Sequence, residues 1–195
     1  MTTWTTWYAT NLSKEQQSNS VLLRKLEGAY CKAKAYRSEI IEAALFIESR
    51  LEMLLCRIFI GGDTDRENLF RELILDPESC TFMQKWKMLH GVIELCGIPQ
   101  NCITDKERSA LFTGLKDLNS ARNKFAHGYF YVDGRDESVQ LRYYEQKNKT
   151  DLLNEKAVDE ILNLANSLNP SMQKLIDAAW AIPRGDAIKV RGLTD

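Results

Sequence analysis

The sequence predicts an all-α fold, an up-and-down bundle of about five to six helices with one small β-hairpin after the fifth helical pattern. Three observations lead to this prediction. Apolar residues recur at spacings of three and four over long stretches, which is the period of an amphipathic helix. The chain has only 4 prolines and 10 glycines, and they fall mainly between these stretches. The period changes after Gly128 to the alternation typical of short strands.

The first part of the chain carries two long helical patterns. A lead-in to about Asn11 precedes the first pattern, over residues 14–35, which can continue as one helix into the second pattern over residues 36–59. The second is the stronger of the two, with apolar side chains at Ile41, Ala44, Leu45, Leu51, Leu55 and Ile58. Gly61 and Gly62 then end it, because glycine is favoured just past a helix terminus.

Shorter elements follow. Helices are expected over residues 67–75 and 81–95, and Thr104 with Glu107 predicts a capping box that opens a helix reaching about residue 126.

Two short strands around a turn are then predicted over residues 129–132 and 139–144. The last helix is expected over residues 151–180, with a kink or break at Asn169-Pro170.

Length and composition fit a globular protein. The 195 residues are 44% hydrophobic and 27% charged, which is enough to fill a core. We expect a single helical domain over residues 1–182 and a C-terminal tail over residues 183–195. The net charge of -1 gives no global positive field. No apolar run is long enough for a transmembrane helix and the first residues lack a signal-peptide pattern, so a cytoplasmic protein without a membrane partner is expected.

Most common enzyme classes lack their motif here. The 5 cysteines are widely spaced with no C-x-x-C pair, which favours reduced thiols over a disulfide framework or a zinc site. Only 2 histidines occur, and neither a Gly-rich phosphate loop nor a G-x-S-x-G elbow is present. We therefore expect neither a metal nor a cofactor.

Chemically active residues concentrate in residues 120–128, SARNKFAHG. On a helical projection His127 lies opposite the apolar stripe, and Asn123 lies one turn before it on nearly the same line. Arg122 lies at the edge of the stripe, where its guanidinium is half-buried and needs an acidic or phosphate partner. The stripe itself consists of Leu111, Leu115, Leu118, Ala121 and Phe125.

Glu48 is the candidate partner of Arg122, because it lies inside the apolar stripe of residues 36–59. Two interpretations remain open: Glu48 meets Arg122 across the edge of the core, or it reaches water at a gap in the packing.

An arginine, an asparagine and a histidine together suit the cleavage of RNA without a metal ion. His127 can serve as base or acid, Arg122 can hold phosphate oxygens, and Asn123 can donate to phosphate or orient the imidazole. His127 supplies one proton-transfer group per chain, so this chemistry requires a homodimer with a composite cleft. The tyrosine-rich hairpin, with Arg142 and Lys147, could flank an RNA groove.

The segment from Arg122 to His127 resembles the R-x4-H motif of the HEPN superfamily, with Asn123 after the arginine. The resemblance extends to helix order over roughly residues 20–180. It implies a metal-independent endoribonuclease, a toxin or defence effector, that works as a dimer with the motif at its interface. It also implies that Arg122 and His127 are the catalytic pair and that Asn123 is their polar helper.

Tyr129 completes R-x4-H-x-Y. In some toxins of the HEPN superfamily that tyrosine is nucleotidylated by a partner nucleotidyltransferase, so the resemblance implies a modification site at Tyr129 and an antitoxin partner. The alternative is an ordinary aromatic residue of the strand.

A second resemblance is narrower. Residues 40–46, IIEAALF, and residues 86–91, WKMLHG, are similar to the mannitol operon repressor family. This similarity implies instead a non-catalytic transcriptional regulator, or a helical module that binds protein or nucleotide.

Overall fold

The computed structural model describes residues 8–76, 78–96 and 102–181. Of these residues, 71% lie in six helices, and a small sheet of four strands accompanies them. The prediction of a mostly helical chain is therefore confirmed, whereas the single expected hairpin is a larger sheet. In the part of the chain that the structure describes, no helix is both long enough and apolar enough to cross a membrane.

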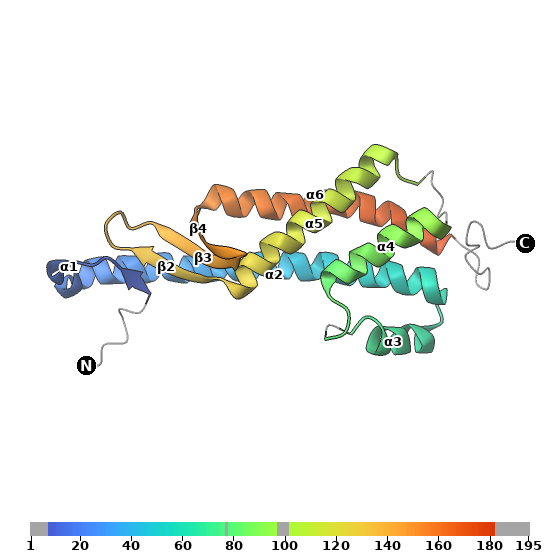
Figure 1. Cartoon of the computed structure of the whole chain (residues 1–195), viewed down its shortest axis with the longest axis horizontal. Coiled ribbons are helices and arrows are strands. Elements are labelled where there is room, and N and C mark those ends of the chain that lie inside the picture. Colours follow the sequence, from blue (N-terminus) through green and yellow to red (C-terminus); the bar gives the residue numbers. More distant parts are fainter. Residues whose placement is uncertain (1–7, 77, 97–101, 182–195) are drawn as a thin grey trace, which may run out of the picture. The chain divides into compact units, whose positions relative to one another are not determined.

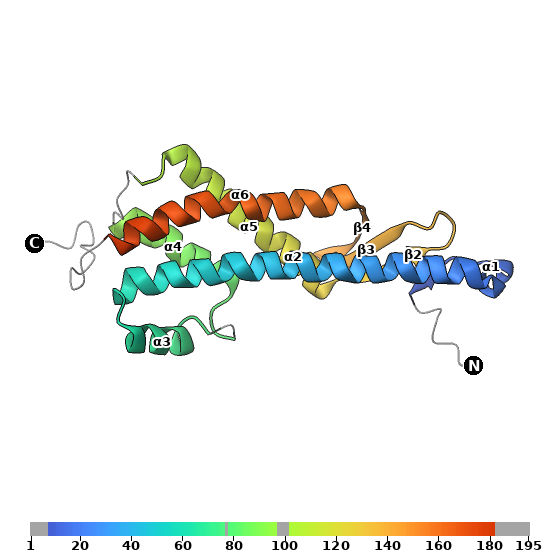
Figure 2. The same cartoon turned by 180° about the vertical axis from the view of Figure 1, so that it is seen from behind.

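The helices follow one another as α1 (Lys14–Ser18), α2 (Ser20–Ile60), α3 (Thr64–Leu73), α4 (Phe82–Cys96), α5 (Asp105–His127) and α6 (Glu155–Trp180), as Figure 1 shows. α2 is one uninterrupted helix of 41 residues, which Figure 2 shows from behind. It begins after Asn19, whose side-chain oxygen accepts hydrogen bonds from the backbone N–H groups of Val21 and Leu22. It ends at Gly61, which has a φ of 76°.

Two helix signals had different outcomes. The capping box of α5 is confirmed, because the Thr104 N–H donates to Glu107 Oε2 at 2.7 Å and the Glu107 N–H donates to Thr104 Oγ1 at 3.2 Å. The expected break at Pro170 is wrong, since α6 continues through this exposed residue to Trp180.

The strands are β1 (Ala9–Thr10), β2 (Tyr129–Asp133), β3 (Val139–Glu145) and β4 (Lys147–Leu153). They lie in the order β1-β2-β3-β4, with β1 parallel to β2 and the other neighbours antiparallel. β4 occupies the start of the helix that was expected from residue 151, so that prediction is wrong there, and α6 begins only at Glu155.

The chain divides into two compact units. Unit 1 consists of Met1–Ala43 and Ser120–Asn163, and unit 2 consists of Ala44–Asn119 and Leu164–Asp195. The main core of unit 1 lies between α2, the end of α5, the sheet and the start of α6, and its buried members are Ala33, Ile40, Phe125, Phe130, Leu141, Tyr143 and Val158. Unit 2 buries the leucines predicted for α5, Leu111, Leu115 and Leu118. The expected tail, residues 183–195, lies outside the described residues, so the prediction of one domain with a tail stays a prediction.

Candidate functional site

The candidate site lies in unit 1, at the joint between α5 and β2. Arg122, Asn123 and His127 occupy the last two turns of α5, and Tyr129 is the first residue of β2. Gly128 alone separates helix from strand, so these side chains come from one short stretch of chain.

Phe125 decides which way this end of α5 faces. Its ring is 4% exposed and lies in the core of unit 1, 6.0 Å from the ring of Phe130 in an edge-on arrangement. With Phe125 pointing inward, Asn123 and His127 are exposed and Arg122 is half-buried. The predicted orientation of these three residues is confirmed.

Arg122 and Asn123 are joined by a hydrogen bond. The Arg122 Nη1 atom donates to Asn123 Oδ1 at 3.0 Å. This contact engages the amide oxygen of Asn123. Within the described residues its Nδ2 group has no acceptor, so it can donate to another molecule.

The His127 imidazole is open to solvent. Within the described residues, no hydrogen bond or ion pair engages either ring nitrogen. His127 is the last residue of α5. Both nitrogens are thus available for proton transfer to or from a bound molecule.

Position 128, where α5 meets β2, has no room for a side chain, so glycine is required there. A Cβ atom at this position would lie 2.5 Å from the backbone oxygen of Lys124 and 2.6 Å from Leu141 Cδ1. Any other residue would push the end of α5 away from β3, and with it His127.

Arg37 holds the same joint from α2. Its Nη2 atom donates to the carbonyl oxygen of Gly128 at 2.5 Å, and its guanidinium carbon lies 4.6 Å from the centroid of the Phe130 ring. The sequence interpretation missed this role, because Arg37 is one of several basic residues in the first helical patterns. Its only sequence signal is a position next to the apolar face that contains Ala33 and Ile40.

The local charge is positive. Residues 120–131 contain Arg122 and Lys124 and no acidic residue. Lys124 lies 3.6 Å from Asp151 and 4.9 Å from the ring centroid of Tyr143, so it faces the sheet. The outward cation within this segment is therefore Arg122.

Tyr129 is 54% exposed and lies beside a second arginine. Its register partner on β3 is Arg142, whose guanidinium carbon lies 6.0 Å from the Tyr129 ring centroid. A side chain this exposed is accessible to a modifying enzyme or to a nucleotide base.

Glu48 has a different partner from the one expected. In unit 2 its Oε1 atom accepts a hydrogen bond from Lys85 Nζ at 2.7 Å, and Glu52 Oε1 accepts another from the same ammonium at 2.5 Å. Lys85 is 0% exposed. Burial lowers the pKa of Lys85, but the hydrogen bonds and charges of Glu48 and Glu52 outweigh it, and the pKa is raised above its ordinary value of 10.5.

The acid in the apolar stripe is therefore explained by a buried ion pair that joins α2 to α4. Arg71 on α3 extends it, with Nη1 3.4 Å from Glu52 Oε2. A signal for this pair was present in the sequence, because Lys85 lies three residues after Phe82 and four before Leu89, on the buried stripe of α4. The partner that the structure gives Glu48 is Lys85, and the expectation that Glu48 supports Arg122 stays a prediction.

Three cysteines of the described residues have unreactive thiols. Burial raises the pKa of the Cys56, Cys80 and Cys102 thiols, which keeps them protonated. Among the residues described, no three His, Cys, Asp or Glu side chains lie close enough together to bind a metal ion.

Comparison of the chain with family models, with curated proteins and with solved structures finds no match in any of the three.

Proposed function

We propose that this chain is a HEPN-like endoribonuclease that cleaves single-stranded RNA without a metal ion and acts as a homodimer. The family assignment and the up-and-down arrangement of helices that accompanies it belong to this proposal. One observation carries it: an exposed imidazole without a partner among the described residues, His127, follows by one turn an asparagine whose amide oxygen is bound by Arg122.

The reaction is an internal transfer of the phosphoryl group. A base removes the proton of the 2′-hydroxyl, and the 2′-oxygen bonds to the neighbouring phosphorus. The bond from phosphorus to the 5′-oxygen breaks, and that oxygen takes a proton from an acid. The products are a 2′,3′-cyclic phosphate and a 5′-hydroxyl, and no further reactant is required.

Each side chain has a role in this step. His127 exchanges the proton, while the remaining N–H groups of Arg122 bind the phosphate oxygens as negative charge develops. Asn123 Nδ2 adds a neutral donor. One chain contributes one imidazole, so the second proton-transfer group is His127 of the partner subunit.

In the cell, this activity suits a toxin or defence effector that needs an inhibitor. The exposed side chain of Tyr129 lies two residues after His127. Attachment of a nucleotide there by an antitoxin of the nucleotidyltransferase class would place bulk and negative charge beside the site, and phosphate of the substrate would be repelled.

The experiment compares purified wild-type protein with His127→Ala, Arg122→Ala and Asn123→Ala on unstructured RNA. The matched control is His90→Ala, because His90 is the other histidine of the chain and lies in unit 2, with Nε2 3.4 Å from Glu94. The proposal expects cleavage by wild type and by His90→Ala, and a loss of about a hundredfold or more in His127→Ala. Cleavage that persists in His127→Ala would overturn it.

Subunit mixing tests the homodimer. Wild type is mixed with about a ninefold excess of His127→Ala and allowed to exchange; cleavage per wild-type chain then falls about tenfold if both imidazoles are needed. Cleavage per wild-type chain that stays constant contradicts the composite site.

The alternative is a non-catalytic regulator or binding module of the mannitol-repressor-like type. The same experiment would support this alternative if neither wild type nor any variant cleaves RNA and if expression of wild type and of His127→Ala has the same effect on cells.

A further inference from the structure

The sheet of unit 1 has one buried face and one open face. Phe130 and Leu141 lie opposite each other in the register of β2 and β3, and both belong to the core. Their neighbours Tyr129 and Arg142 are also paired, and because side chains alternate along a strand, they lie on the other face.

Three tyrosines gather on the open face. Tyr129 is 54% exposed and Tyr144 is 76% exposed. Tyr131 is half-buried, with its ring centroid 6.4 Å from that of Tyr129, and its hydroxyl donates to Gln140 Oε1 at 2.6 Å. Packing against the core does not account for the rings of Tyr129 and Tyr144, because both are largely exposed.

The exposed charge on this face is positive. Arg142 lies among the tyrosines, between Gln140 and Tyr144 on its own strand. By alternation Asp133 would be on the same side, but it is 2% exposed and is paired with Arg135 Nη2 at 2.6 Å. Among these residues, a strand of nucleic acid would therefore meet a cation and no exposed carboxylate.

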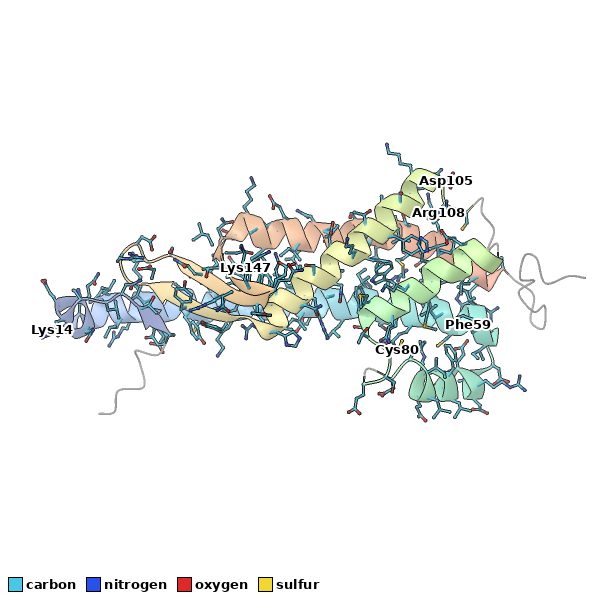
Figure 3. The ribbon with its side chains drawn as sticks, in the orientation of Figure 1. Lys14, Phe59, Cys80, Asp105, Arg108 and Lys147 are labelled. Carbon is cyan, nitrogen blue, oxygen red and sulfur yellow. The ribbon has the colours of Figure 1, made fainter. Side chains whose placement is uncertain are left out.

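This face begins where the candidate site ends. A Cβ on Gly128 would lie 3.1 Å from the backbone oxygen of Arg142, so the joint after His127 abuts β3 at that residue. Tyr144 lies two residues beyond Arg142, toward the β3–β4 hairpin, where Figure 3 labels Lys147. Because β2 and β3 are antiparallel, this hairpin and His127 lie at the same end of the sheet.

We propose that Tyr129, Tyr131, Arg142 and Tyr144, together the tyrosine face, bind the unpaired bases of an RNA strand whose scissile phosphate is held by Arg122 beside His127. The inference rests on the proposed function, from which the identity of the ligand is taken. Each exposed ring stacks on one base and Arg142 binds a phosphate, so the face accepts single strands of any sequence. Paired RNA is excluded, because its bases are already stacked.

Binding is measured by fluorescence anisotropy with a fluorescein-labelled 2′-O-methyl RNA of unstructured sequence, which lacks the nucleophile for cleavage. A second probe has the same sugar-phosphate chain with abasic positions. The variants are Tyr129→Leu, Tyr144→Leu and Tyr144→Phe. Phe46→Leu is the control, since Phe46 is an exposed aromatic of unit 2 with the Arg50 guanidinium carbon 5.7 Å from its ring centroid.

Each leucine variant is expected to raise the Kd for the base-bearing strand about tenfold, and Tyr144→Phe, which keeps a ring, to leave it within about twofold. Phe46→Leu should bind like wild type, and all proteins should bind the abasic strand equally. Equal binding of the base-bearing strand by wild type and both leucine variants overturns the tyrosine face. So does a wild type that binds the abasic strand as tightly as the base-bearing one.

Cleavage of unmodified RNA, measured on the same proteins, separates this inference from the proposed function. Stacking-dependent binding without any cleavage retains the tyrosine face and rejects the nuclease. Cleavage with binding that is insensitive to the tyrosines retains the nuclease and rejects the face. Far-ultraviolet circular dichroism and Tm establish that each variant is folded.

Discussion

Arg37 on α2 donates a hydrogen bond over 2.5 Å to the carbonyl oxygen of Gly128, the residue that directly follows His127. This carbonyl lies at the end of α5, where backbone oxygens lack a partner within the helix. Arg37 therefore supplies a hydrogen-bond donor to this carbonyl, at the point where the helix turns into the strand. It thereby fixes the direction of the chain just after His127.

Replacing Arg37 should loosen this joint. We expect Arg37→Gln to lower the free energy of unfolding by about 2 kcal/mol, because a charge-assisted hydrogen bond and the contact with Phe130 are lost. For RNA cleavage, kcat should fall about tenfold with little change in KM, since the imidazole is misplaced while the binding groups remain. Arg37→Lys, which keeps a cationic donor, should recover part of kcat. Equal kcat in wild type and Arg37→Gln would remove Arg37 from its positioning role.

Gly128 and Gly28 form a matched pair of substitutions. Gly128→Ala brings a Cβ within 2.5 Å of the Lys124 carbonyl oxygen, so we expect a loss of about 1–3 kcal/mol in the free energy of unfolding. Gly28 lies in the interior of α2, and apart from the adjoining backbone of its own helix no atom lies within 4 Å of the position that an added Cβ would take. Gly28→Ala should therefore stabilise by about 0.5–1 kcal/mol. Urea unfolding measures both, and opposite signs are predicted. A destabilised Gly28→Ala, or a neutral Gly128→Ala, contradicts the packing described for the joint.

The buried Lys85 of unit 2 should contribute strongly to the stability of the fold. Lys85→Met leaves the carboxylates of Glu48 and Glu52 without their shared cation, and we expect a loss of about 3–5 kcal/mol in the free energy of unfolding. Lys87→Met, two residues along α4 at an exposed position, should change it by less than about 0.5 kcal/mol.

The pH dependence of this stabilisation has a defined sign. Because the folded pKa of Lys85 is raised above 10.5, its contribution is present in full below pH 10.5 and is lost as pH rises through the folded value. The difference between wild type and Lys85→Met should therefore shrink only in strong alkali. Equal stability of the Lys85→Met and Lys87→Met proteins at neutral pH would contradict the ion pair.

The lowered pKa of Glu107 predicts that the protein loses stability in acid. Its pKa is lowered from 4.5 to about 2 by the hydrogen bond from Lys174 and by the backbone and side-chain hydrogen bonds from Thr104. A lowered folded pKa stabilises the protein above the unfolded value, so this contribution is lost as pH falls from about 4.5 to about 2. Tm measured across this range should fall more steeply for wild type than for Glu107→Gln. Parallel curves would show that the capping box does not bind its carboxylate in the charged form.

Local signals predicted the helices well. The capping box at Thr104 and the glycine stop after Ile60 mark helix ends through contacts within a few residues, so they are legible in the sequence. The orientation of His127 followed from the apolar stripe of α5 in the same way.

The sequence did not predict which segments pair over long distances along the chain. β4, KNKTDLL, has no alternation of apolar and polar residues, and it is a strand because its backbone pairs with β3. β1 has two residues and is a strand only because it pairs with β2, where Ala9 lies opposite Val132, far along the chain. The partner of Glu48 was missed for a related reason, since helical projection places a residue on a face but does not say which helix that face meets.

The central claim is that His127 transfers a proton during cleavage of RNA. The most direct measurement uses a DNA strand that contains a single ribonucleotide and identifies the product ends by mass spectrometry. The account predicts that wild type cuts only after the ribonucleotide and leaves a 2′,3′-cyclic phosphate, and that His127→Ala leaves the strand intact. Cleavage by His127→Ala at the wild-type rate, or cleavage at positions without a 2′-hydroxyl, would contradict it.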